Sequence, residues 1–518
     1  MNFILQSVVI ISLILCQNIS ITYNYLPFIG DDLHYYEPLR YDTELTFPQL
    51  SRHKRSTSQI SDLDKLRISF YAHNQKFNLH LRRDYSIFHN NIKIRDGANQ
   101  HVPLSHDTLN LYDGIVESSI SSSKGYCFGS ISDGIFDGQM LTEQGTYYIT
   151  KIPPTMSHVL NYTAHSIIYH EKHVKEIKGV QSHRCGVKDS VNNWMNDKED
   201  LKVNRTFDQK KMDNEIFKLN DKIAKQAQQT HKRPKREATL ATNRVSSRKL
   251  CSMYIRTDGM LWDAVQTEEF GNVRTRTEES DDKTRAKITE LIHKHVKKLN
   301  LIMENTFFTD KINSLVFQIV KMDILEPEKP KCQPFCDRNL DSSPFLDVQS
   351  QSDHSDFCLA YAFTYRDWTE GTLGVAWIAG LNQAGGICED HKRASFVEGY
   401  RSRNTGVVTL KNSGRRIPIP KSELTFSHEV GHNLGSPHDE DASCLGSEED
   451  GKFLMYPYSN SGNLKNHAKF SECSKKKIGV IFDQERRLDG CLEPFDGSFC
   501  GDGILDEGIF GLLYFSVF

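Results

Sequence analysis

The sequence has few long apolar runs. Residues Phe3–Cys16 form one, whose length suits the hydrophobic core of a secretory signal peptide but is too short for a membrane helix. The run Ile509–Phe518 reaches only about half of the roughly 20 apolar residues that a membrane span requires. We therefore expect a signal peptide at residues 1–22, entry into the secretory pathway and a secreted or extracellular product, with no membrane span in this chain.

An excess of charge of either sign is also missing. The 518 residues include 64 Lys and Arg against 67 Asp and Glu, which leaves a net charge of −3. Neither a basic stripe nor a strongly acidic tail is present, so nucleic acid is excluded as a predicted partner. With 38% hydrophobic and 25% charged residues, the composition is typical of a soluble globular protein, and the length suits two or three domains.

Internal repeats and long low-complexity tracts are absent as well, and the clearest change of composition is a charged stretch at residues 186–249. We expect a linker at residues 186–236, between an N-terminal domain at residues 23–185 and a second domain at residues 237–495. Residues 496–518 then form a C-terminal tail.

The end of the linker carries a processing pattern. Arg233, Lys235 and Arg236 form an R-x-K-R sequence, which furin-type processing proteases of the secretory pathway recognise through acidic clefts. Cleavage is expected after Arg236. A solvated basic run is the alternative interpretation, and it applies equally to a second R-x-K-R at Arg52–Arg55. The position between two domains favours processing.

A histidine motif dominates the second domain. The sequence "HEVGHNLGSPHD" places His428, His432 and His438 in the pattern H-E-x-x-H-x-x-G-x-x-H, which arises by chance in roughly one of ten thousand such chains. Residues four apart lie on one helix face, so His428 and His432 can direct ring nitrogens at one point. Ser422 is the expected N-cap of this helix. Gly435 is expected to end it and to bring His438 back to the same point.

This motif predicts a catalytic zinc site. Three imidazoles occupy three positions of a tetrahedral Zn2+ and leave the fourth for a water, which loses its proton near neutral pH. Glu429 directly follows His428 and is the expected base for that proton. The pattern thus indicates a zinc-dependent peptidase with protein or peptide substrates. Ordinary surface or core histidines are the alternative interpretation.

Cys185 suggests a means of keeping such an enzyme latent. It lies in "SHRCGVKDS", just before the linker, and a thiolate is a strong zinc ligand that would exclude water from the open position. Cleavage after Arg236 would release it. The alternative is a disulfide between Cys185 and Cys127.

The two domains differ in their patterning. "LRISFYAHNQKFNLHLRRD" and "GTYYITKI" alternate apolar and polar residues, so residues 60–180 are predicted to be a β-rich domain. In the second domain "KITELIHKHVKKLNLI" has helical periodicity, and "SLVFQIVKM", "CLAYAF", "LGVAWIAG" and "GVVTL" are typical of strands. Helices and strands alternate there, which predicts an α/β fold. The six residues expected on one helix face are Ile288, Leu291, Ile292, Val296, Leu299 and Ile302.

The histidine motif, together with Met455 in "FLMYPYS", resembles the metzincins, in which a methionine turn lies beneath the zinc. "CLAYAFTYRDW", "GTLGVAWIAG" and "GGIC" resemble the ADAM proteases of the Kuzbanian type, the alpha-secretase and Notch-processing sheddases. The likeness runs from about residue 30 to residue 507. It implies a metzincin-type mixed sheet with helices and a zinc cleft, preceded by a β-rich prodomain whose cysteine switch maps onto Cys185.

The resemblance also implies partners and cross-links. The expected substrates are ectodomains of membrane proteins, and full-length relatives are single-pass cell-surface proteins. The implied disulfides are Cys251–Cys358, Cys388–Cys491 and Cys444–Cys473. In a secretory setting, Asn161 in "NYT" and Asn204 in "NRT" are candidate glycosylation sites, with chance occurrence as the alternative.

Two features depart from the family pattern. Cys332 and Cys336 are an additional pair with no expected catalytic role. "CGDGILDEG", from Cys500, resembles the start of a disintegrin domain, after which the apolar tail follows. We expect a truncated form of the family, with Cys500 left without its partner. A latent or decoy chain that binds substrates or partners without cleaving them is therefore the alternative function.

Overall fold

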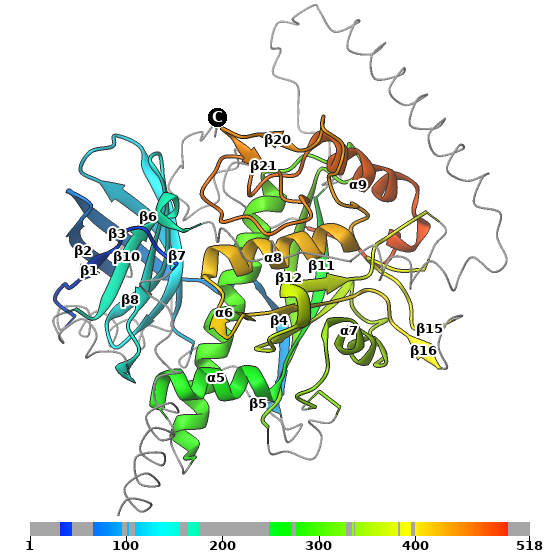
Figure 1. Cartoon of the computed structure of the whole chain (residues 1–518), viewed down its shortest axis with the longest axis horizontal. Coiled ribbons are helices and arrows are strands. Elements are labelled where there is room, and N and C mark those ends of the chain that lie inside the picture. Colours follow the sequence, from blue (N-terminus) through cyan, green and yellow to red (C-terminus); the bar gives the residue numbers. More distant parts are fainter. Residues whose placement is uncertain are drawn as a thin grey trace, which may run out of the picture.

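The computed structural model describes the chain as two units that share an interface (Figure 1). The described residues are 32–43, 66–95, 101–102, 109–155, 164–175, 248–271, 276–327, 334–335, 337–381, 384–394 and 399–495. Outside them lie the predicted signal peptide, Cys185, the linker with Arg233, Lys235 and Arg236, the candidate glycosylation sites Asn161 and Asn204, Cys332, Cys336, Cys500 and the C-terminal tail. Within these ranges, every helix is too short or too polar to cross a membrane.

An eight-stranded antiparallel sheet forms most of the N-terminal unit. In β2 the residues Leu66, Ile68 and Phe70 are buried while those between them are exposed, as the alternating pattern predicts. The β-rich character of this region is confirmed. Along the sheet the strands are β1 (Glu37–Leu39), β10 (Ser166–His170), β9 (Gly145–Lys151), β8 (Ile135–Thr142), β7 (Lys124–Ser132), β6 (Leu111–Ser118), β3 (Gln75–Arg83) and β2 (Leu66–Ala72), and the short helix η4 (Glu171–His173) follows β10.

Two strands of the N-terminal region belong to the other sheet. β4 (Phe88–Arg95) pairs in parallel with β12 (Ser314–Ile324), and β5 (His101–Val102) pairs with β4. They appear as blue strands at the margin of the second sheet in Figure 1. The sequence predicts a domain at residues 23–185, but it does not predict that one strand of this region pairs with the second sheet. The physical reason is that alternation fixes which face a strand buries, but not which sheet it joins.

The second unit is built on a mixed sheet in the order β14-β17-β13-β11-β12-β4-β5. Neighbours from β17 to β4 are parallel, whereas β14 and β5 run antiparallel to their partners, and β22 adds an antiparallel contact to β11. This arrangement confirms the predicted α/β class. The remaining strands are β11 (Arg248–Thr257), β13 (Leu359–Thr364), β14 (Gly374–Ala376), β17 (Thr405–Thr409) and β22 (Glu493–Pro494).

Helices and small hairpins complete the second unit. The helices are α5 (Gly259–Phe270), α6 (Glu278–Glu304), α7 (Ser342–Ser350), α8 (Ile419–Asn433) and α9 (Glu472–Gln484), with short turns η6 (Thr369–Gly371) and η7 (Arg486–Leu488). The two-residue hairpins are β15 (Lys392–Arg393) with β16 (Tyr400–Arg401), β18 (Lys411–Asn412) with β19 (Arg415–Arg416), and β20 (Gly446–Ser447) with β21 (Gly451–Lys452).

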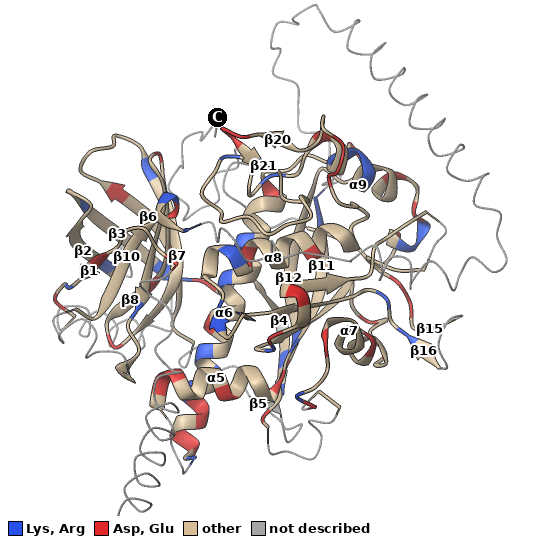
Figure 2. Ribbon diagram, viewed as in Figure 1, with Lys and Arg blue, Asp and Glu red and all other residues tan. Residues whose placement is uncertain are grey.

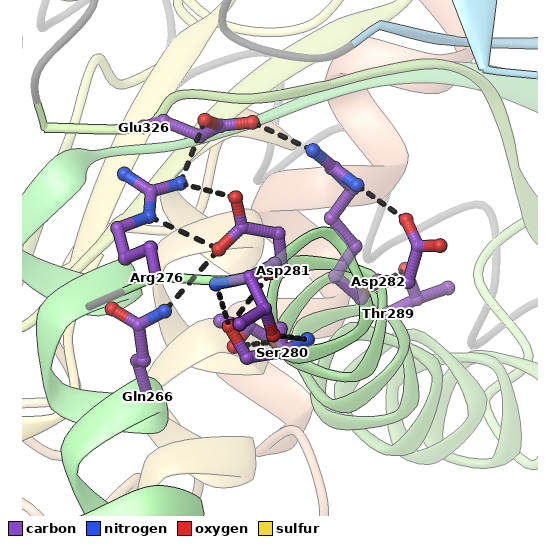
Figure 3. Close-up of polar contacts among 10 residues, drawn as sticks. Gln266, Arg276, Ser280, Asp281, Asp282, Thr289 and Glu326 are labelled. Atoms are coloured by element: carbon purple, nitrogen blue, oxygen red, sulfur yellow. Dashed lines mark hydrogen bonds and ion pairs between the residues drawn. The ribbon is translucent and has the colours of Figure 1, made fainter. Parts of the chain in front are cut away.

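The long helix α6 begins at a well-defined cap. Thr277 and Ser280 form a reciprocal capping box, in which each hydroxyl accepts a backbone N–H of the other residue. Figure 3 shows the adjacent ion pair in which Glu326, just after β12, accepts from Arg276 at 2.8 Å. Glu326 also accepts from Arg285 at 2.9 Å. These contacts fasten the start of α6 to the sheet. The six apolar residues predicted on its inner face are all buried.

α6 lies between the two units and contacts both of them. It packs against β12 on one side and against β7 of the N-terminal sheet on the other. Figure 2 shows acidic residues around α5 and the start of α6, and basic residues further along α6. There Lys294 contacts Asp137 at 2.6 Å and Lys297 contacts Asp84 at 2.7 Å. Burial opposes the charge of Asp84, but Lys297 and His293 outweigh it and hold the pKa of this carboxyl well below its usual value.

Candidate metal centre

The helix that carries the histidine motif starts earlier than predicted. α8 spans Ile419–Asn433, with Pro418 at the N-cap and Pro420 in the first turn, where a missing N–H costs nothing. The expectation that Ser422 is the N-cap is wrong, because its own N–H already bonds to the carbonyl of Pro418. Its hydroxyl instead lies 3.0 Å from His295 Nε2 of α6. This contact joins the two central helices.

The three motif histidines come together at one point. His428, His432 and His438 each offer a ring nitrogen, and these nitrogens all lie within 4.8 Å of one another. The Nε2 atoms of His428 and His432 are 3.1 Å apart, one helical turn along α8. Gly435, at φ 108°, ends the helix and reverses the chain, as expected from the sequence, and so brings His438 beside the other two.

Backbone carbonyls orient two of the rings. His428 Nδ1 is 2.6 Å from the carbonyl oxygen of Leu454, and His432 Nδ1 is 2.7 Å from that of Ser436. An Nδ1–H that donates to a carbonyl leaves the Nε2 lone pair free for a metal. Burial, with a smaller effect of His438, lowers the pKa of His428 to about 3, and burial followed by the neighbouring rings puts that of His432 well below its usual value. Both rings are therefore neutral, as metal ligands must be.

Met455 lies directly beneath this helix. It is fully buried, and a Cβ at Gly431, between the first two histidines, would strike its sulfur. The carbonyl of Met455 accepts the N–H of Asp439 at 2.9 Å, which ties the segment after His438 to the same turn. The Met455 segment thus supports both the helix and the third histidine from below.

Glu429 is buried on α8 beside the sheet, next to His428 in sequence. Its carboxyl group packs against Gly374 of β14, where a Cβ would lie 2.6 Å from Glu429 Cγ. The Glu429 carboxylate and the imidazoles of His428 and His432 therefore all belong to α8. The donor set suits a divalent ion such as zinc, because neutral imidazoles are borderline ligands and three of them leave coordination positions open.

Several residues of the site were missed from the sequence. The carbonyls of Leu454 and Ser436 carry no side-chain signal, so no pattern could have identified them. Asn433 lies within the quoted motif, where its amide donates to the carbonyl of Trp377 at 2.7 Å and its oxygen accepts from the Tyr361 hydroxyl. An asparagine at a helix end usually suggests only a cap, whereas this one fastens α8 to the sheet.

The cysteines of the second unit are cross-linked. The three disulfides implied by the family resemblance are present, namely Cys251–Cys358, Cys388–Cys491 and Cys444–Cys473. A second close group of possible ligands, Cys358, Cys388 and Cys491, is made of these bonded sulfurs and has no thiolate to offer a metal. Cys127 is a free, buried thiol among the described residues, whereas Cys185, its alternative partner in the sequence analysis, lies outside them.

Comparisons with known proteins agree with this site. A model of metallo-peptidase family M12B, reprolysin-like, matches residues 285–484, which include the whole histidine motif. The Caenorhabditis elegans homolog of disintegrin and metalloproteinase domain-containing protein 10 is 33% identical over 521 residues, covering 91% of this chain and 53% of the relative. The proteins of that name from Bos taurus and Homo sapiens are each 30% identical, covering 92% of this chain and 59% of theirs.

The chain thus spans little more than half the length of the curated relatives it matches. Among solved structures, metalloproteinase-II from Bacteroides fragilis aligns over 80% of this chain and 90% of its own at 11% identity, with a TM-score of 0.32. Residues 285–484 thus match the reprolysin-like M12B metallopeptidase family, and over most of its length the chain is similar to disintegrin and metalloproteinase (ADAM) proteins of the Kuzbanian type.

Proposed function

We propose that this chain is a zinc-dependent endopeptidase that cleaves extended segments of extracellular proteins. The observation that carries the proposal is the convergence of His428, His432 and His438 within 4.8 Å, with Glu429 buried on the same helix. A bound zinc would lower the pKa of water and polarise the scissile carbonyl. The three imidazoles would hold the ion, and the carbonyls of Leu454 and Ser436 would fix the two buried rings.

Glu429 would move the proton. Its carboxylate takes a proton from the attacking water and later passes it to the leaving amine, which needs the group close to both atoms. Its burial keeps bulk water from competing for that proton. Met455 packs against α8 at Gly431 and so fixes the position of the helix that carries Glu429.

An extended substrate segment would bind at the edge of the sheet. β14 is the last strand in the sheet order, paired with β17 on one side and with no strand on the other among the described residues. Such an edge offers backbone N–H and C=O groups to an added strand. Because Gly374 of this strand touches Glu429, a segment bound there would lie beside the proposed base.

The N-terminal unit would keep the enzyme latent. The proposal combines a cysteine switch at Cys185, cleavage after Arg236 by a furin-type protease, and the interface of α6 with the N-terminal sheet. The interface supports it, because β4 pairs with β12 and buried ion pairs of Lys294 and Lys297 hold the two units together. The disulfides suit an oxidising compartment, consistent with a secretory route to the cell exterior.

A variant lacking the proposed base tests this function. Glu429→Ala should lower kcat on an unstructured peptide by about 10²- to 10⁴-fold, because general acid–base catalysis contributes that much. Bound zinc, measured by metal analysis, should remain. Unmodified protein should acquire Glu237 as its new N-terminus and lose activity with a chelator. If the processed wild-type protein cleaves no peptide, the proposed activity fails and a decoy that binds without cleaving is favoured.

A further inference from the structure

The strand β14 faces the active-site helix at a position without a side chain. A Cβ placed on Gly374 would lie 2.6 Å from Cγ, 2.7 Å from Oε1 and 2.9 Å from Cδ of Glu429. These distances are shorter than those at which non-bonded atoms pack. Gly374 is not in the left-handed region, so its backbone does not itself require glycine. Glycine is required at position 374 because a larger residue would not fit beside Glu429.

We propose that Gly374 is a positioning residue for Glu429: the missing side chain leaves the recess in which the carboxylate lies. The proposal rests on the proposed function, because it takes Glu429 as the base. Gly374 does not act on substrate through a side chain, and it is not a catalytic residue. Its role is to let β14 approach α8 closely, and this close approach fixes the position of the Glu429 carboxylate.

The helix is attached to the sheet close to this point, and these contacts oppose a movement that would relieve the clash. Asn433 holds α8 against the sheet, with its amide donating to the carbonyls of Trp377 at 2.7 Å and Thr405 at 3.2 Å. Burial keeps the pKa of Tyr361 well above its usual value, with a smaller contribution from Glu429, so its hydroxyl retains the proton that it donates to Asn433. On the opposite side, Gly431 is in contact with Met455.

A methyl group at position 374 would therefore displace the carboxylate rather than the helix. The metal ligands lie elsewhere on α8 and after it, and their orienting carbonyls belong to Leu454 and Ser436. The three atoms nearest to the new methyl all belong to Glu429, and neither carbonyl is among them. The expected consequence is an enzyme that folds and keeps its metal, but whose base is misplaced.

Gly406 provides a matched control. It lies on β17, whose register pairs it with Ala376 of β14, and a Cβ there would strike the ring of Tyr361 instead of Glu429. Gly406→Ala thus also crowds the contact between the sheet and α8. The two substitutions differ in the group that they displace, so only Gly374→Ala should depend on the presence of Glu429.

The first measurement is a double-mutant cycle on the Tm of the full chain. Gly374→Ala should lower Tm by about 2–4 °C in the wild-type background, and should cost nothing in Glu429→Ala, where the colliding atoms are gone. Gly406→Ala should cost the same in both backgrounds. Additive Tm changes for Gly374→Ala and Glu429→Ala, or a Gly374→Ala/Glu429→Ala protein that does not fold, would overturn the proposal.

The second measurement uses the processed protein and an unstructured peptide. Gly374→Ala should lower kcat by about 10²-fold, as a misplacement near 1 Å can do, with KM and zinc content unchanged. Peptide affinity should be equal in Glu429→Ala and in the double variant. A raised KM with normal kcat would instead assign Gly374 to substrate binding and end the proposal. If wild-type protein cleaves nothing, the proposed function fails, while the Tm cycle still tests the packing.

Discussion

At the scale of single residues, the site depends on histidines that the folded structure keeps in their neutral form. His428 and His432 are kept neutral mainly by burial, and each is turned by one backbone carbonyl. His295 of α6 is held in a similar way, although it is not one of the three motif histidines. Its Nδ1 is 2.8 Å from the carbonyl of Leu291 and its Nε2 is 3.0 Å from the hydroxyl of Ser422. These residues make stability depend on pH.

We expect His295→Gln to make the free energy of unfolding less dependent on pH at acidic pH. Burial, against a smaller opposite effect of Leu291, lowers the pKa of His295 to about 4 from 6.5. The unfolded chain therefore binds a proton that the folded chain does not, and wild-type stability falls as pH drops from 6.5 towards 4. Urea unfolding at several pH values, with metal removed, measures the slope. An equally steep slope in the variant would contradict the assignment.

The spacing of residues predicted which histidines come together but not which groups hold them in place. His428, His432, Gly435 and His438 could be found because helix geometry and one left-handed turn convert their intervals into a common point. The carbonyls of Leu454 and Ser436, and the recess at Gly374, depend on segments that are distant in sequence and brought together by packing. No local pattern encodes such distances.

At the scale of elements, α6 and α8 form the centre of the molecule and meet the N-terminal sheet. The periodicity of Ile288 to Ile302 predicted the inner face of α6, because a 3.6-residue repeat is intrinsic to a helix. The start of α8 was misjudged, since Ser422 is a good cap in isolation but Pro418 and Pro420 begin the helix one turn earlier. Glu423, the residue after Ser422, is buried and accepts from Gln139 of β8.

Glu423→Gln should stabilise the chain at alkaline pH. Burial, opposed by Lys298 and Lys294, raises the pKa of Glu423 to about 8 from 4.5, so the folded chain holds a proton that the unfolded chain has lost. Stability is fully present below pH 4.5 and declines as pH rises through 8. The variant removes this decline and can still accept from Gln139. Free energies of unfolding at pH 5 and pH 8.5 should diverge between the two proteins, and parallel changes would refute this.

At the scale of the whole molecule, the contacts that join the two units include one strand pair and a buried charge cluster. Asp84 lies 3.2 Å from His293 and 2.7 Å from Lys297, and Asp113 lies 3.5 Å from the same Lys297. Hydrophobic residues of the β4 region, Ile87, Phe88 and Ile94, belong to the core of the second unit. Removing one partner from such a buried pair leaves the other charge without compensation.

Lys297→Met should therefore destabilise the full chain by about 3–5 kcal/mol, as expected for breaking a buried ion pair. Lys283→Met is the control: its pair with Glu279 on the same helix is exposed, and its loss should cost less than about 1 kcal/mol. Denaturant unfolding of both variants measures the difference. Equal, small losses would show that the cluster contributes little to holding the units together.

The shared strand β4 has a consequence for how the chain is made. Phe88–Arg95 leave the ribosome more than two hundred residues before Ser314–Ile324, the segment with which they pair. At the usual pace of synthesis, on the order of 10 s or more passes before that partner emerges. During this interval the strand has a bare edge and no sheet to join, so the nascent N-terminal region needs protection from aggregation until its own protease domain appears.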